Sequence, residues 1–234
     1  MTSRTVAFLD ADVLSAPLTR TLILVSAAHE DAQFVFRWSR AVEVEADRHA
    51  RPGQTLVSSL RELLDWDSML VADASEDDVT RLVDTSPRDR HVLAADQGAG
   101  ARVLVTRNVA DFGALDLLQA GLVAAHPDVF LAATMSAEMY MATLEQMSTA
   151  RTRPPDTPEM LHAAIFAGHP QLFDRMTRVF PDIAPLPGDE SPPGVVFRGE
   201  RCLLCGASMV SDSTFLCCTC RSSAGCPILP GFES

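Results

Sequence analysis

The sequence contains no lysine, so all 19 basic residues are arginines. A chain without lysine cannot supply the lysine of a Walker A phosphate-binding loop, and it cannot form a Schiff base through a lysine amine. Contacts to phosphate must therefore come from arginine side chains or from backbone N–H groups. The 31 acidic residues give a formal net charge of -12, which argues against broad, non-specific binding of nucleic acid.

Long apolar runs are also absent. No run approaches the ~20 residues that cross a bilayer. The N-terminal residues MTSRTVAFLD lead directly into an expected strand, without the apolar stretch and cleavage site of a secretory signal. We therefore expect a cytoplasmic protein that does not engage a membrane. With 234 residues, 47% of them hydrophobic, the chain has enough material for one substantial domain and an appendage.

Strands alternate with helices in the first half of the chain. Apolar runs predict strands at 4–9, 34–38 and 102–106. Periodicity and capping residues predict helices over 13–28, 39–50, 54–65, 77–83 and 87–97. This alternation predicts an α/β fold with a parallel sheet and crossover helices. Such sheets bind ligands beyond the carboxyl ends of their strands, at the point where the strand order reverses.

The second half of the chain changes character twice. Residues 127–180 read as helical, with Pro154-Pro155 separating two parts, and five prolines between 181 and 193 predict a stiff linker. All six cysteines follow it. We therefore divide the chain into an α/β domain (1–125), a helical extension (126–180), a Pro-rich linker (181–200) and a Cys-rich tail (201–234).

Four acidic residues mark the candidate site. Asp10 and Asp111 follow predicted strands, whereas Glu45 and Asp89 lie on predicted helices. A cluster of carboxylates costs free energy unless a cation neutralises it. An all-oxygen ligand set favours a hard cation, Mg2+ or Mn2+. Glu43 competes with Glu45 for the helix position, and the helical register from Ser39 favours Glu45.

The surroundings of these acids resemble the PIN-domain ribonucleases, specifically the branch that includes VapC-type toxins. The matching strings are FLDADVL, WSRAVEVEAD, SPRDRHVLAAD and LVTRNVADF, within about residues 4–125. The last string is the most specific, because Thr106, Arg107, Asn108, Asp111 and Phe112 all fit. The stretch that begins GLVAAHPDVFLAATM also resembles the C-terminal helical extension of some members of this branch.

This resemblance implies a PIN-like parallel sheet and metal-dependent hydrolysis of RNA phosphodiester bonds by water. It assigns Asp10, Glu45, Asp89 and Asp111 as ligands of Mg2+ or Mn2+, with Asn108 ordering the site by hydrogen bonding. It further implies an RNA substrate, a cognate antitoxin that holds the toxin inactive, and a homodimer.

Two acidic residues depart from the family pattern. Asp12 stands where an amide or hydroxyl residue is usual, so it is either an additional metal ligand or a modifier of metal affinity. Asp96 replaces a small apolar residue, seven positions after Asp89 on the same helix face, from which it can approach the cluster. We favour the simpler interpretation of Asp96, a solvated helix end. His91, two residues after Asp89, is expected to face away from the site, in packing or at the surface.

Two alternative functions stay open. The string FLDADV also fits the first motif of haloacid-dehalogenase-type phosphatases, in which Asp10 would be the nucleophile and Asp12 the general acid. The lack of lysine, and of an adjacent acidic pair after a later strand, disfavours this alternative. The other alternative is a non-catalytic PIN-fold binding protein, and the presence of all four acids argues against it.

The cysteine tail predicts a structural zinc site. Cys202 and Cys205, followed after 11 residues by Cys217 and Cys220, have the spacing of a tetrahedral all-thiolate site. Cys218 can replace Cys217 as a ligand, and Cys226 is left over. Disulfides are unexpected in a cytoplasmic protein. A tail of about thirty residues cannot build its own core, so zinc would supply its folding free energy.

Overall fold

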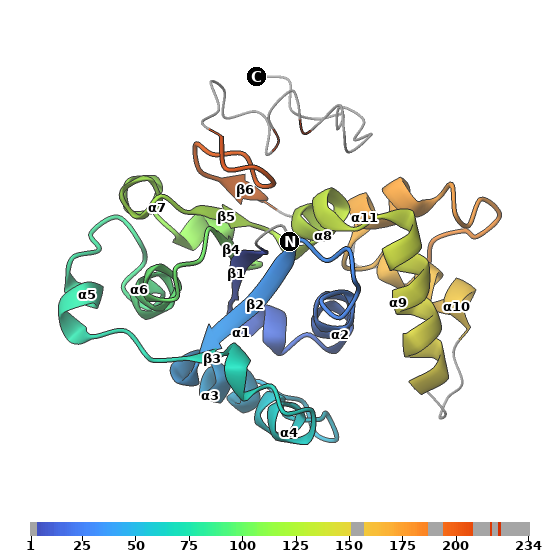
Figure 1. Ribbon diagram of the computed structural model, residues 1–234, viewed down its shortest axis with the longest axis horizontal. Helices are drawn as coiled ribbons and strands as arrows, with labels where there is room; N and C mark the ends of the chain where they lie inside the picture. Colours follow the sequence, from blue (N-terminus) through green and yellow to red (C-terminus); the bar gives the residue numbers. More distant parts are fainter. Residues whose placement is uncertain (1–3, 151–156, 187–193, 208–215, 217–219, 221–234) are drawn as a thin grey trace.

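A computed structural model describes residues 4–150, 157–186, 194–207, 216 and 220. A six-stranded sheet lies at its centre, in the order β3-β2-β1-β4-β5-β6 (Figure 1). The first five strands are parallel, and β6 runs antiparallel to β5. The strands are β1 (Thr5–Leu9), β2 (Phe34–Ser39), β3 (Leu70–Val71), β4 (Val103–Val105), β5 (Val123–Ala125) and β6 (Phe197–Arg198). The prediction of an α/β fold with a mostly parallel sheet is confirmed.

Strand order places a reversal between β1 and β4. The chain adds β2 and then β3 on one side of β1, and adds β4 and then β5 on the other. Ala7 of β1 therefore pairs with Phe36 on one side and with Val103 on the other. The carboxyl ends of β1 and β4 flank this reversal, which is where open parallel sheets bind ligands.

Helices cover both faces of the sheet. In Figure 1, α6 and α7 lie on one side and α2 and α8 on the other. Every residue of β4 and β5 is buried, as expected for parallel strands covered on both faces. The helices are α1 (Ala11–Leu14), α2 (Pro17–Ser26), α3 (Arg40–Arg48), α4 (Val57–Leu63), α5 (Glu76–Thr80), α6 (Arg90–Gly98), α7 (Ala114–Ala120), α8 (Pro127–Thr134), α9 (Ala137–Ala150), α10 (Pro158–Ile165) and α11 (Pro170–Met176), with 3-10 turns η1 (Asp67–Met69) and η2 (Val109–Asp111).

Two predicted helices have different bounds because of proline. The segment predicted as one helix over 13–28 forms α1 and α2, and Pro17 occupies the first turn of α2, where its missing N–H costs nothing. The helix predicted from Pro87 begins at Arg90 instead. Pro87 lies in the preceding turn, so Asp89 stands at the helix N-cap position rather than inside the helix.

The segment predicted to be helical, 127–180, contains α8 to α11. The ring of Phe130 in α8 contacts Phe34 and Phe36 of β2 edge-on, at centroid distances of 5.0 and 5.9 Å. Asp128 of α8 accepts the backbone N–H groups of Gln171 and Leu172, which ties α11 to α8. These helices thus share a core with the sheet. Pro154-Pro155 lies outside the described residues.

Within the described residues, none of the helices is both long enough and apolar enough to cross a membrane. The longest of them, α9, has one buried apolar face and one exposed polar face. Met139, Leu144 and Met147 are buried, whereas Glu145 is exposed.

The interpretation of Asp96 as a solvated helix end is wrong. Its side chain is completely buried in α6, and among the described residues neither carboxyl oxygen has a hydrogen-bond partner. Burial raises the pKa of Asp96 well above its usual value, because the ionised form is disfavoured away from water. The physical reason is the cover on this side of the sheet: α6 packs against β2 and α5, and Asp96 is fully buried within that packing.

We predict that Asp96→Ala stabilises the protein at alkaline pH. An acid whose pKa is raised by folding loses stability as pH rises from its unfolded pKa, near 4, through its folded pKa. The gain should reach about 1–3 kcal/mol near pH 8 and shrink toward pH 4, as measured by urea unfolding. Gln97→Ala, at an exposed neighbour, should show no such pH dependence. A variant that is less stable at every pH would contradict the prediction.

Candidate functional site

Asp10 lies at the carboxyl end of β1, between the two central strands. Its backbone N–H donates to the carbonyl of Val105 at 3.1 Å. One carboxylate oxygen accepts the N–H of Ala11 at 2.7 Å and so caps α1, and the other accepts the hydroxyl of Thr106 at 2.8 Å. The side chain is only 6% exposed. Asp10 is therefore fixed by contacts with its own neighbour in the chain and with the end of β4, the strand on the other side of the reversal.

Asp12 holds the turn that follows β4. Its two carboxylate oxygens accept the backbone N–H of Arg107 at 3.2 and 3.0 Å. The hydroxyl of Thr106 also lies 3.4 Å from Asp12, but its single proton is better placed for Asp10. Thr106 thus separates two carboxylates that come from the same end of the sheet.

The electrostatics of this pair favour a cation. Burial, followed by repulsion from Asp12, raises the pKa of Asp10 well above its usual value, against the opposing hydrogen bonds from Thr106 and Ala11. Burial also raises the pKa of Asp12 to about 6, although the N–H and the charge of Arg107 lower it in part. Both shifts mean that the ionised forms are costly in the protein alone. A divalent cation would remove that cost.

Asp89 connects the remaining acids electrostatically. It is partly buried before α6, and burial is the largest cause of its raised pKa. Asp111 and Glu45 raise it further by repulsion, whereas a hydrogen bond from Ser86 and the nearby His91 lower it. Asp89 also raises the pKa of Asp10. Asp89 therefore interacts electrostatically with each of the other three predicted acids, Asp10, Glu45 and Asp111.

Glu45 faces a residue that we expected to point elsewhere. The Nε2 atom of His91 lies 3.7 Å from a carboxylate oxygen of Glu45, and Nδ1 of the same ring lies 2.8 Å from the carbonyl oxygen of Arg88. His91 is partly exposed, as expected of a surface residue, but its ring faces Glu45 rather than pointing away from it. His91 lies in the first turn of α6, two residues after Asp89, and its ring reaches Glu45 of α3.

The competing residue, Glu43, is already engaged. Its carboxylate accepts hydrogen bonds from Arg40 at 2.7 Å, from Arg61 at 2.8 Å and from the indole N–H of Trp38 at 3.2 Å. It is 1% exposed. Glu43 is thus a buried structural anion that fixes α3 to α4, whereas Glu45 keeps partly exposed oxygens.

Asp111 and Asn108 bound the exposed turn η2. The N–H of Asp111 donates to the carbonyl of Asn108, and the carbonyl of Asp111 accepts the N–H of Ser86 at 2.8 Å. Asn108 donates its backbone N–H to Thr106 at 3.1 Å. Its side chain is exposed and makes no hydrogen bond to the described residues. Asn108 thus joins the site through its backbone, and a role for its amide group stays a prediction.

The acids are not close enough together to form a complete metal-binding group by themselves. Among the described residues, only Cys202, Cys205 and Cys220 bring three potential ligand atoms within 4.8 Å of one another. The carboxylates are spaced more widely. Mg2+ commonly binds proteins through one or two carboxylates and keeps several waters, so this spacing fits a partly hydrated cation that a phosphate oxygen can approach.

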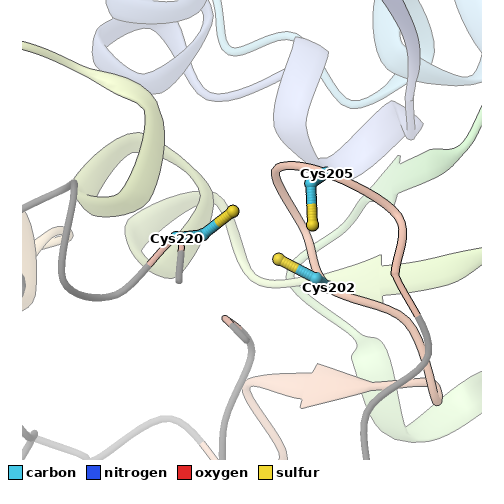
Figure 2. Close-up of side chains that lie close together, drawn as sticks. All are labelled: Cys202, Cys205 and Cys220. Atoms are coloured by element: carbon cyan, nitrogen blue, oxygen red, sulfur yellow. The ribbon is translucent and has the colours of Figure 1, made fainter. Parts of the chain in front are cut away.

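The three cysteines form a second candidate centre, away from the acids in the sequence. Figure 2 shows the sulfurs of Cys202, Cys205 and Cys220 pointing toward one another. Cys202 is buried, Cys205 is exposed and Cys220 is intermediate. The fourth predicted ligand, Cys217, lies outside the described residues, as do Cys218 and Cys226.

Residues that the sequence did not single out complete the acidic site. Thr106 was noted only as a fit to the family string, yet its hydroxyl lies between Asp10 and Asp12. Ser86 opens the string SPRDRHVLAAD but was given no role, and it contacts both the Asp111 turn and Asp89. A polar residue directly after a buried strand was the available signal for Thr106.

Comparison with known proteins gives one informative match. No protein-family model and no solved structure matches the chain. Over 100 residues the chain is 36% identical to the protein named "Putative ribonuclease VapC50" of Mycobacterium tuberculosis (strain ATCC 25618 / H37Rv). The match covers 42% of this chain and 59% of that protein, so the chain spans about three fifths of the length of this relative. The likeness supports a relationship to PIN-domain, VapC-type ribonucleases, as the motifs indicated.

Proposed function

We propose that this protein is a Mg2+- or Mn2+-dependent endoribonuclease that acts as the toxin of a toxin–antitoxin pair. The observation that carries the proposal is the group of acids at the reversal between β1 and β4, in which Asp10, Asp12 and Asp89 all have raised pKa values. Burial is the largest cause of each shift, joined at Asp10 and Asp89 by repulsion from neighbouring acids, and a divalent cation would relieve the cost of ionising these groups. The similarity to a protein named as a ribonuclease supports RNA as the substrate.

In this proposal Asp10, Glu45, Asp89 and Asp111 hold the cation, and Asp12 is an additional or outer ligand. A bound divalent cation would polarise the phosphate and lower the pKa of an attacking water. The protein's part is positioning. Thr106 and the N–H of Ala11 fix both oxygens of Asp10, so that little reorganisation is needed when a cation and a phosphate bind.

Binding of RNA to a chain with net charge -12 requires locally placed cations. Arg107 is exposed and directly follows Thr106, and Arg88 is exposed beside Asp89. Both guanidinium groups can pair with phosphate oxygens at the rim of the site. No lysine is available for this task, so arginine carries it alone.

The proposal includes a cognate antitoxin that covers the site and a homodimeric toxin. Both follow from the resemblance to VapC-type toxins. The similarity to a protein with that name supports the antitoxin, whereas the homodimer rests on the resemblance alone. An antitoxin of this kind would place a basic group among the carboxylates or exclude the cation from them.

We predict that purified protein cleaves a mixed RNA pool only with Mn2+ or Mg2+, and that Asp10→Asn and Asp111→Asn each lower the rate at least about 100-fold, because each removes a metal ligand. The measurement is gel-resolved cleavage followed by sequencing of the new ends. Asp182→Asn, at an exposed acid far along the chain, should cleave like the wild type.

Two other results would refute the nuclease. Hydrolysis of small phosphoesters with a phosphoryl group trapped on Asp10 would identify a phosphatase. Metal binding by folded protein, without cleavage of any RNA in the pool, would identify a binding protein. An unchanged rate in both Asn variants would remove these acids from the site.

We predict that Mn2+ raises the melting temperature more at pH 8 than at pH 5. The raised pKa values of Asp10 and Asp12, the latter about 6, mean that metal-free protein loses stability as pH rises from near 4 through those values. A cation removes this loss. Asp10→Asn should melt higher than the wild type without metal at about pH 8 and gain little from Mn2+. Equal gains at both pH values would contradict this.

We predict that Arg107→Gln weakens RNA binding while leaving metal binding intact. The substitution keeps the backbone N–H that Asp12 accepts and removes one cation at the rim. In catalytically inactive Asp10→Asn protein, the slope of log affinity against log salt should fall by about 1. Arg48→Gln, an exposed arginine on α3, serves as the matched control. Equal slopes in the two variants would place the RNA elsewhere.

A further inference from the structure

The segment around Cys202 forms a turn that suits a metal-binding thiolate pair. The N–H of Gly206 donates to the carbonyl of Cys202 at 2.9 Å, and the N–H of Cys202 donates to the carbonyl of Ala207 at 2.8 Å. Gly206 has φ +73, a left-handed conformation that favours glycine. The closed turn brings Cys202 and Cys205 to one side of the segment.

Cys220 completes the group from a separate part of the chain. Its sulfur and those of Cys202 and Cys205 all lie within 4.8 Å of one another (Figure 2). In a tetrahedral thiolate site with Zn–S bonds of about 2.3 Å, sulfurs stand about 3.8 Å apart. The observed arrangement needs only a small contraction around an ion. Three soft thiolates with no carboxylate among them favour zinc over Mg2+ or Mn2+.

We propose that Cys202, Cys205 and Cys220 bind one structural Zn2+, and that this zinc clamps the C-terminal segment onto the nuclease sheet and steadies the turn that carries Asp111. This site is separate from the acidic site. It does not require the protein to cleave RNA.

Arg102 joins the cysteine turn to the sheet. The residue directly precedes β4, and its guanidinium donates to the carbonyl of Leu204, between the two cysteines. The same side chain packs on Gly206, where a Cβ atom would lie 3.1 Å from Nη1. Leu203 is completely buried and anchors the turn beside this contact. A zinc ion that closes the turn would hold these contacts in place.

Strand β6, a few residues before Cys202, continues the connection. It pairs with β5, and the carbonyl of Val196 accepts the N–H of His126 at 2.8 Å. Arg198 of β6 donates to the carbonyl of Phe112 at 2.6 Å and to that of Ala110 at 3.2 Å. These two residues flank Asp111. The cysteine turn is therefore linked to the candidate catalytic turn by three residues of chain, 199–201, and by the side chain of Arg198.

The first test counts zinc in full-length protein purified anaerobically. We expect about one zinc per chain by elemental analysis, released by a mercurial reagent, and Co2+ substitution should give sulfur-to-metal charge-transfer absorption. Cys202→Ser, Cys205→Ser and Cys220→Ser should each lose most of the zinc, whereas Asp10→Asn keeps it. Comparing Cys217→Ser with Cys218→Ser identifies the fourth ligand.

Several results would overturn the site. Iron in place of zinc, blocked thiols without any metal, or zinc that is lost in Asp10→Asn but kept in the cysteine variants would each do so. Where a cysteine variant does not fold, mercurial release from the wild type still decides the matter, because only thiolate-held zinc responds to the reagent.

The second test examines the clamp by hydrogen exchange, with no need for RNA cleavage. Removing zinc from the wild type should speed amide exchange at least about 10-fold in residues 109–113 and 123–125, but not in β1. Arg198→Gln should speed exchange in 109–113 alone and keep its zinc. If neither zinc removal nor Arg198→Gln changes the exchange rate in residues 109–113, the zinc site does not steady the turn that carries Asp111.

Discussion

The hydroxyl of Thr106 between Asp10 and Asp12 is the contact on which the rest of the candidate site depends. Parallel strands end together, so two carboxylates at the end of β1 meet the polar residue that ends β4. Burial makes the charges costly, and the hydroxyl and amide donors reduce that cost only in part. Groups with pKa values shifted in this way are frequent at functional sites.

The surrounding elements hold the other acids around that pair. Glu43, with two arginines and an indole, fixes the start of α3, and Glu45 lies two residues further on the same helix. Ser86 joins the Asp111 turn to the segment that carries Asp89. Polar residues with structural roles thus surround the candidate ligands. A carboxylate such as that of Glu43, whose oxygens already accept several hydrogen bonds, is a poor candidate for binding metal.

Local sequence predicted β1, β2 and β4, but it did not predict β3, β5 or β6, and β6 lies in the segment that was expected to be a linker. Uniformly apolar runs before Asp10 and Thr106 predicted the central strands, and their parallel order predicted that the following residues meet. Sequence was insufficient where distant packing decides the outcome. Asp96 looked like the polar end of a helix, yet the packing of α6 against β2 buries it completely. The approach of His91 to Glu45 likewise joins α6 to α3, two helices far apart in the sequence.

Strand β6 also matters for how the molecule behaves among its own copies. A sheet edge presents unpaired N–H and C=O groups that invite pairing with another chain, and long exposed edges promote aggregation. Here one edge is β3, which is only two residues long, and the other is covered by β6, of the same length. Because β6 adjoins the cysteine turn, detachment of that segment would uncover β5, whose three residues are all buried and apolar. The cysteine-bearing segment would then determine colloidal solubility as well as local order.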